Sequence, residues 1–168
     1  ERTSIQYQTY VQILKEELVP AMGCTEPIAL AYCAAKAKEV LGVLPERCVV
    51  EASGNIVKNV KSVIVPNTGG LKGIEAAAAA GVVAGDAGRV LEVIAGVTQE
   101  QKIQIKEYME KTPIQVKPLE TDELLDMIVT LYRDGSYAKV RIANYHTNIV
   151  LIEKDGEKLY EMGVMATE

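Results

Sequence analysis

Two Asp-Gly pairs in the last third of the chain constrain its fold more than any other feature. Asp134-Gly135 and Asp155-Gly156 each separate two runs rich in β-branched and aromatic residues. Asp-Gly is a strong signal for the tight turn of a hairpin, which joins neighbouring antiparallel strands. Residues 138–142 alternate between apolar and charged side chains, as expected of a strand with one buried and one solvent-exposed face. The sequence therefore predicts an antiparallel sheet in this part of the chain.

The remaining elements are predicted from apolar periodicity and from residues that start or stop helices. Strands are expected at residues 48–52, 62–65, 113–117, 124–133, 137–144, 147–153 and 158–161. Helices are expected at residues 5–19 and 26–41, after Gly73 to about residue 84, at 87–95 and after Thr98 to about residue 111. Thr25 is expected to cap the start of the second helix, and Gly42 its end. Residues 56–61 fit a helical turn or a strand.

The composition favours helices packed closely on a sheet. The chain has 168 residues, with eight Tyr but no Phe and no Trp, so Ala, Val, Ile and Leu must build most of the core. The length suits one domain or one lobe of a larger enzyme. We therefore expect residues 1–168 to form a single α+β domain, with helices packed on one face of a mixed, mostly antiparallel sheet.

Charge and cysteine usage exclude several classes of protein. The formal net charge is −5 and the basic residues form no cluster, which argues against nucleic acid as a partner. No apolar run reaches the length of about 18 residues that a membrane span needs, and the chain starts at Glu1 without a leader sequence. Three cysteines without a CxxC pattern fit neither a disulfide framework nor a zinc site. We expect a cytoplasmic domain of a longer protein, with no nucleic-acid or membrane partner.

Cys24 lies where one helical pattern has ended and the next begins. A helix N-terminus favours negative charge, so a thiol placed there has a lowered pKa and is suited to react or to bind metal. The alternative is that Cys24 packs as a small residue in a tight turn. Glu26 also has two interpretations: a carboxylate that complements the helix dipole, or an acid or base beside the thiolate.

Cys33 and Cys48 are expected to fill the core. Nine residues along a helix rotate a side chain by about 180°, so Cys24 and Cys33 point to opposite sides. Cys48 opens a predicted strand. If Cys24 binds a metal, its fellow ligands are therefore not these two cysteines.

Two other segments carry polar groups that suit a small acidic ligand. Residues 67–70 (Asn-Thr-Gly-Gly) lie between a predicted strand and a predicted helix, where backbone N–H groups can bind a carboxylate. Their spacing matches neither a P-loop nor GxGxxG, and a plain loop before a helix is the alternative. His146, the one histidine, is either a general base near neutral pH or a surface residue in a bend.

Taken together, four stretches resemble the iron–sulfur L-cysteine desulfidases, which are relatives of the PLP-independent L-serine dehydratases. The stretches are residues 23–29 (Gly-Cys-Thr-Glu-Pro-Ile-Ala), 65–70 (Val-Pro-Asn-Thr-Gly-Gly), 84–86 (Ala-Gly-Asp) and 146–148 (His-Thr-Asn). The resemblance implies a lyase that eliminates sulfide from L-cysteine and yields pyruvate and ammonia. It also implies a [4Fe–4S] cluster, with Cys24 as one of three cysteine ligands and the other two in a downstream half.

The resemblance further implies roles for individual residues. Those expected to bind the amino-acid substrate are Thr25, Asn67, Thr68, Gly69, Gly70 and Asn148, and those expected to be catalytic are Glu26 and His146. Family members are much longer, so the chain resembles an amino-terminal lobe, whose partner is the carboxy-terminal half of the same polypeptide. Such a lobe cannot complete a cluster by itself. A weaker similarity suggests the allosteric substrate-binding-type domain of the serine dehydratases.

Three alternatives to the desulfidase activity remain open. The first is L-serine dehydratase activity at the same site. The second is a regulatory domain that binds an amino acid without catalysis. The third is an assembly module that forms a homo-oligomer through its Ala-rich helices.

Overall fold

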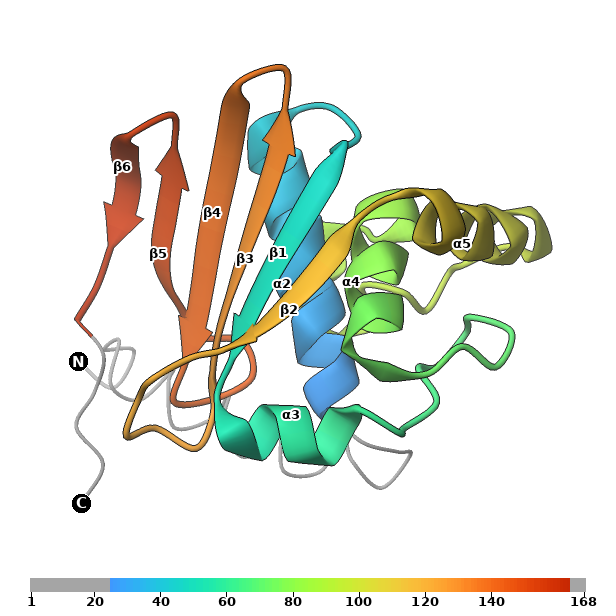
Figure 1. Ribbon diagram of the computed structural model, residues 1–168, viewed down its shortest axis with the longest axis horizontal. Coiled ribbons are helices and arrows are strands. Elements are labelled where there is room, and N and C mark those ends of the chain that lie inside the picture. The colour runs from blue at the N-terminus through green and yellow to red at the C-terminus, as the bar shows by residue number, and fades with distance from the viewer. Residues whose placement is uncertain (1–24, 164–168) are drawn as a thin grey trace, which may run out of the picture.

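The computed structural model describes residues 25–163, which form a sheet and a set of helices (Figure 1). The helices are α2 (Thr25–Leu41), α3 (Gly54–Val60), α4 (Gly73–Ala84), the 3-10 helix η2 (Ala87–Glu92) and α5 (Gln99–Lys111). The strands are β1 (Arg47–Ala52), β2 (Ile114–Pro118), β3 (Asp126–Arg133), β4 (Ser136–Ala143), β5 (Ile149–Lys154) and β6 (Glu157–Glu161). α2 packs against β3 and β4, and α4 packs against α2. The expected α+β class is confirmed.

The six strands lie in the order β2-β1-β3-β4-β5-β6. β1 pairs in parallel with β2, and every other neighbouring pair is antiparallel, so the sheet is mixed and mostly antiparallel, as predicted. In the turn between β3 and β4, φ is 51° at Asp134 and 80° at Gly135, and the turn between β5 and β6 repeats this with 50° at Asp155 and 87° at Gly156. Positive φ at both central residues is the mark of the type I′ hairpin turn that Asp-Gly favours.

The core lies between the sheet and α2. Met127, Val129 and Leu131 of β3 are fully buried, and so are Val140 and Ile142 of β4, which follows from the two-residue period of a strand with one buried face. The Ala-rich helices meet closely. A Cβ atom added at Gly81 of α4 would lie 2.3 Å from the carbonyl oxygen of Ala31 in α2, so only glycine permits this approach.

Three predictions about local structure are wrong. Residues 62–65 form no strand, because their backbone groups are used in local turns; Ile64 makes only an isolated bridge to Lys72. β-Branched residues favour a strand only where a neighbouring strand is available. The helix expected at 87–95 is a short 3-10 helix, interrupted at Val90 with φ 54° and ψ −112°. Thr25 lies inside the first turn of α2 and is therefore not its cap.

Several helix boundaries are confirmed. Gly42 has φ +89° and its N–H donates to the carbonyl of Lys38 at 2.8 Å, as expected of a C-terminal cap. Both hydrogen bonds of the capping box between Thr98 and Gln101 are present at the start of α5. Most of the undecided stretch 56–61 lies in α3, which Ser53 caps.

The helix expected at 5–19 and Cys24 lie outside the described residues. Between residues 25 and 163, no helix has both the length and the apolar character that a membrane span requires.

Candidate functional site

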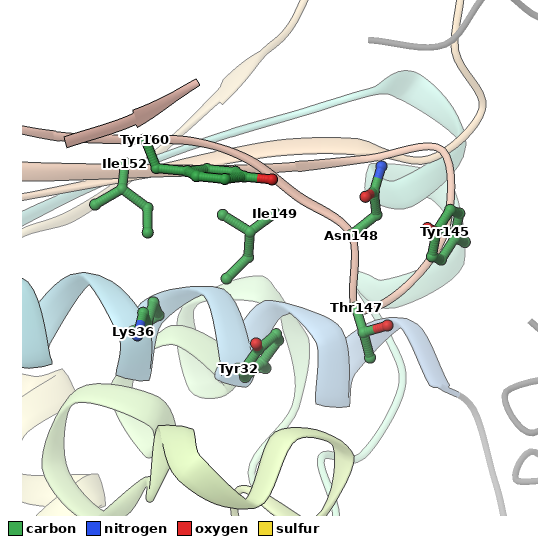
Figure 2. A pocket seen from close by; sticks show the side chains of 8 residues that line it. All are labelled: Tyr32, Lys36, Tyr145, Thr147, Asn148, Ile149, Ile152 and Tyr160. Atoms are coloured by element: carbon green, nitrogen blue, oxygen red, sulfur yellow. The ribbon is translucent and has the colours of Figure 1, made fainter. Parts of the chain in front are cut away.

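A cavity of about 390 Å³ lies between α2 and the β5–β6 edge of the sheet (Figure 2). α2 contributes Tyr32 and Lys36, which are four residues apart and therefore share one face of the helix. Ile152 of β5 and Tyr160 of β6 are paired across the two strands and so present the same face to the cavity. The other lining residues are Tyr145, Thr147, Asn148 and Ile149. The volume is in the range of small-molecule sites.

The described residues that line the cavity include several with hydroxyl groups and the basic residue Lys36. Lys36 Nζ forms an ion pair with Glu39 at 3.1 Å, with 28 % of the Lys36 side chain and 58 % of the Glu39 side chain exposed. Burial, followed by the nearby Cys33 and Glu39, raises the pKa of Tyr32. Its hydroxyl therefore stays neutral at physiological pH and can donate a hydrogen bond. Among residues 25–163, no Asp or Glu lines it.

The loop between β4 and β5 carries two of the predicted site residues. Asn148 is 7 % exposed and lines the cavity, while its side-chain amide donates to the carbonyl of Ala143 at 2.8 Å and so closes the loop. His146 lies between the two lining residues Tyr145 and Thr147, is half-buried, and has a buried Nε2 atom. The structure thus brings Asn148 and His146 together beside α2.

The first turn of α2 holds Thr25 and Glu26. Thr25 is 3 % exposed, and its hydroxyl has no hydrogen-bond partner among the residues that the structure describes. An unsatisfied buried hydroxyl costs free energy unless a partner is supplied. Glu26 is half-buried in the same turn, where a carboxylate complements the helix dipole.

The predicted carboxylate-binding loop lies elsewhere. Asn67 donates to the carbonyl of Ile94 at 3.0 Å, and Thr68 donates to the carbonyl of Val65 at 2.8 Å and accepts from the N–H of Leu71 at 3.1 Å. Both side chains are therefore used to hold the loop. Within the described part of the chain, the N–H groups of Gly69 and Gly70 make no hydrogen bond.

Thr68 and Gly69 line a second cavity, of about 240 Å³, with residues of α5 that include Lys102 and Lys106. Asn148 and the neighbours of His146 line the first cavity. The residues predicted from the sequence to share one substrate are thus divided between two cavities.

The two described cysteines are core residues, as predicted. Cys33 is fully buried, its Sγ donates to the carbonyl of Val140 at 3.3 Å, and burial raises its pKa to about 12. Cys48 is fully buried beside the hydroxyl of Tyr108 at 3.4 Å, and burial again raises its pKa. Both sulfur atoms are enclosed in the core, so the structure gives these two cysteines a packing role. Residues 25–163 hold no group of three His, Cys, Asp or Glu side chains that could bind a metal.

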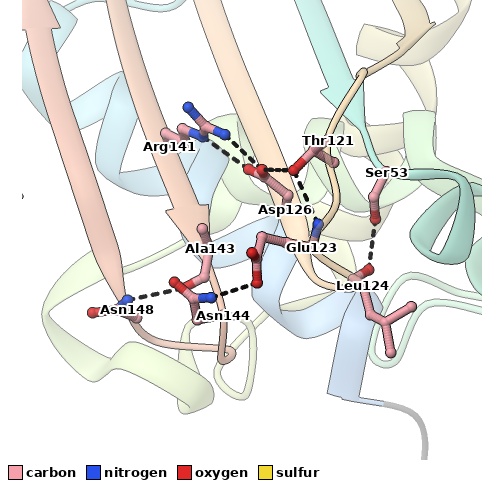
Figure 3. A network of polar contacts seen from close by, with 9 residues as sticks. All are labelled: Ser53, Thr121, Glu123, Leu124, Asp126, Arg141, Ala143, Asn144 and Asn148. Atoms are coloured by element: carbon pink, nitrogen blue, oxygen red, sulfur yellow. Dashed lines mark hydrogen bonds and ion pairs between the residues drawn. The ribbon is translucent and has the colours of Figure 1, made fainter. Parts of the chain in front are cut away.

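Sequence reasoning missed a polar network at the end of the sheet that carries the β4–β5 loop (Figure 3). Asp126 is fully buried and accepts from Nε of Arg141 at 2.8 Å and from Nη2 at 2.6 Å. Thr121 donates to the same carboxylate at 2.7 Å. Asn144, the first residue of the loop, donates to Glu123 at 2.7 Å. The sequence carried only a weak signal of this network. Asp126 lies near the start of the predicted strand 124–133, and Arg141 occupies a solvent-facing position of the next predicted strand.

The geometry defines an α+β domain with a cavity of small-molecule size at one edge of its sheet. The chain is 59 % identical to a UPF0597 protein of Desulfitobacterium hafniense, over 97 % of this chain and 38 % of that protein. It is 47 % identical to a UPF0597 protein of Treponema denticola, over 92 % of this chain and 36 % of that protein. The chain thus spans a little over a third of the length of the curated relatives that it matches. No protein-family profile matches it.

These relatives correct the family expected from the sequence. The proteins similar to almost the whole of this chain are named UPF0597, and their names do not designate iron–sulfur desulfidases or serine dehydratases. The assignment to the L-cysteine desulfidase family is therefore wrong. Four short stretches carried that resemblance, whereas the similarity to the UPF0597 proteins extends over 163 residues.

Proposed function

We propose that this chain is one lobe of a lyase that eliminates sulfide from L-cysteine. The observation that carries the proposal is the buried hydroxyl of Thr25 in the first turn of α2, which has no hydrogen-bond partner in the described part of the chain. Cys24 precedes Thr25 in the sequence, and a thiol at a helix N-terminus would be favoured as the thiolate. The activity is proposed on these residues and does not depend on membership of the desulfidase family.

The elimination requires a base for the α-proton of L-cysteine. Loss of that proton and cleavage of the Cβ–S bond release hydrogen sulfide and leave 2-aminoacrylate, which becomes an imine and is hydrolysed to pyruvate and ammonia. His146 and Glu26 are the proposed proton carriers, because an imidazole and a carboxylate can each act as a general base and both side chains are half-buried. Thr25 and Asn148 are the proposed substrate contacts on that side of the molecule. L-Serine, which would lose water in the same way, is the alternative substrate.

The role first predicted for residues 67–70 changes in this proposal. Asn67 and Thr68 already hold their loop, so carboxylate binding there would fall to the N–H groups of Gly69 and Gly70. Because that loop lines the second cavity, we do not place it on the same substrate molecule as Asn148.

The proposed [4Fe–4S] cluster has little support within this chain. The two described cysteines are buried in the core, so Cys24 would be the ligand from this chain and the others would come from the rest of a longer polypeptide, which is the proposed partner of the lobe. A bound cluster would supply a Lewis acid for the leaving group.

The proposal is tested on the full-length protein, purified without oxygen. We expect iron and acid-labile sulfide in the preparation and release of sulfide from L-cysteine, and we expect Cys24→Ala to abolish all three. Cys33→Ala is the matched control on the same helix, because its Sγ contacts only the core. Full sulfide release by Cys24→Ala, or by a colourless preparation, would contradict the proposal.

A second candidate function is a regulatory domain that binds a small molecule without catalysis. The cavity of about 390 Å³ favours it, since described residues of α2, β5 and β6 line it. Calorimetric titration with L-cysteine and L-serine separates the two candidates. A regulatory domain binds ligand without turnover, and its affinity is unchanged by Cys24→Ser.

A further inference from the structure

The cavity between α2 and β5–β6 is lined by one charged residue of the described chain, Lys36. Its polar lining residues are Lys36, Tyr32, Tyr145, Thr147, Asn148 and Tyr160. Among residues 25–163 its lining includes no carboxylate, and the Glu39 carboxylate that pairs with Lys36 is more than half exposed. The one charged residue that this part of the chain supplies to the lining is therefore basic. A ligand carboxylate would be paired there, whereas a ligand ammonium would meet another ammonium.

Lys36 keeps the capacity to bind an anion despite its ion pair. An ammonium group has three donors, and one of them is used by Glu39 at 3.1 Å. The pair is exposed on the Glu39 side, where ion pairs contribute little. A carboxylate that enters the cavity can therefore bind Lys36 without first breaking a strong interaction.

The wall opposite α2 is apolar. Ile149 and Ile152 lie between the Tyr160 ring and α2 (Figure 2), and the volume of about 390 Å³ exceeds the needs of a ligand as small as acetate. A short hydrocarbon chain would fill this part of the cavity and bury apolar surface.

We infer that this cavity binds a small carboxylate that carries an apolar carbon chain and no ammonium group, such as a 2-oxo acid. The ligand carboxylate pairs with Lys36, its oxo group accepts from the tyrosine hydroxyls, and its chain lies on Ile149 and Ile152. The inference rests on the second candidate function: it keeps ligand binding without catalysis at this cavity and replaces the amino acid by a carboxylate without an ammonium group. It does not rest on the lyase activity, which is measured by sulfide release.

The test compares two ligands with the same carbon skeleton, 4-methyl-2-oxopentanoate and L-leucine, by calorimetric titration of the full-length protein. We expect the oxo acid to bind at least about tenfold more tightly, because the ammonium of L-leucine would be desolvated without a counter-charge. Lys36→Gln should weaken binding of the oxo acid by about tenfold, the usual effect of losing a hydrogen bond to a charged group.

Lys38→Gln is the matched control, because Lys38 lies on the same helix but lines a different cavity. It should leave the affinity unchanged. Tyr160→Phe is a second variant, which removes one hydroxyl from an exposed strand. It should weaken binding of the oxo acid by a few-fold.

Equal or tighter binding of L-leucine would overturn the inference while leaving the regulatory function standing. Binding of neither ligand would overturn the inference, and so would equal losses in Lys36→Gln and Lys38→Gln. None of these results bears on sulfide release, so the failure of this inference and the failure of the lyase proposal are distinguishable.

Discussion

The guanidinium of Arg141 holds the fully buried carboxylate of Asp126 through two hydrogen bonds, of 2.8 Å from Nε and 2.6 Å from Nη2. Asp126 begins β3 and pairs with Ala143, at the end of β4. The ion pair therefore fixes the end of β4 from which the loop with His146 and Asn148 departs. The hydrogen bond to Asp126 is the main cause of the raised pKa of Arg141.

Arg141→Met should destabilise the protein by about 2–3 kcal/mol, because it leaves a buried carboxylate without its partner. The value lies below that of a fully buried pair because 27 % of the Arg141 side chain is exposed. Urea denaturation measures the change. Lys139→Met is the control on the same strand and the same face, since no ion pair of Lys139 is found between residues 25 and 163. Equal losses of unfolding free energy in the two variants would show that the Arg141–Asp126 ion pair does not stabilise the protein.

Gly81→Ala should destabilise the protein by about 2–3 kcal/mol, as overpacking of a tight contact does. The new Cβ would lie 2.3 Å from the backbone oxygen of Ala31, so α2 and α4 would have to separate. Gly54→Ala is the matched control, because a Cβ there meets nothing within 4 Å and φ is not positive. Thermal denaturation of both variants checks the prediction, which fails if Gly81→Ala is as stable as Gly54→Ala.

Asp155 should contribute a pH-dependent stability to the β5–β6 turn. The N–H of Tyr137 at 2.9 Å and the hydroxyl of Ser136 lower the pKa of Asp155 below its ordinary value of 3.8. A lowered pKa in the folded state means that the contribution is complete above pH 3.8 and is lost as the pH falls through the folded value.

Asp155→Asn removes the negative charge but keeps a side chain that tolerates the positive φ at this position. A change in stability therefore reports the effect of the charge. Urea denaturation at pH 7 should find the variant less stable than the wild type, and the difference should shrink below pH 3.8. A difference that is constant from pH 7 to pH 3 would refute the role of the carboxylate.

Cys33 and Cys48 should be unreactive in the folded protein. Both thiols are buried and have raised pKa values, so almost no thiolate is present at pH 8. Labelling with a thiol reagent at pH 8 should modify neither residue until denaturant is added, as peptide mapping can check. Rapid modification of Cys33 in the native protein would mean that α2 does not pack on β4 as the structure has it.

Much of the fold could be predicted because its signals are local. Asp-Gly at 134–135 and 155–156 requires two residues with positive φ, which few other dipeptides tolerate. The capping box of Thr98 and Gln101 is likewise completed within four residues. The prediction of a strand at 62–65 failed for the opposite reason, since a strand needs a neighbour and none of the described strands pairs with this run; Ile64 makes only an isolated bridge to Lys72.

The candidate site was predicted less well, because it depends on contacts between distant segments. The sequence placed residues 67–70 with His146 and Asn148, whereas the structure divides them between two cavities. Lys36, Tyr32 and Tyr160 carried no motif, and they became candidates only when the cross-strand pairing of β5 and β6 brought Tyr160 over α2.

The amino-acid sequence by itself determined the order and the type of most elements, the two hairpins, and the burial of Cys33 and Cys48. These depend on backbone preferences, apolar periodicity and charge, which act over a few neighbouring residues. Only the tertiary structure decided that β1 pairs in parallel with β2, that Arg141 meets Asp126, and that a cavity lined by Lys36 opens beside α2. Each of these requires residues far apart in the chain to meet, and no local preference specifies which of them will do so.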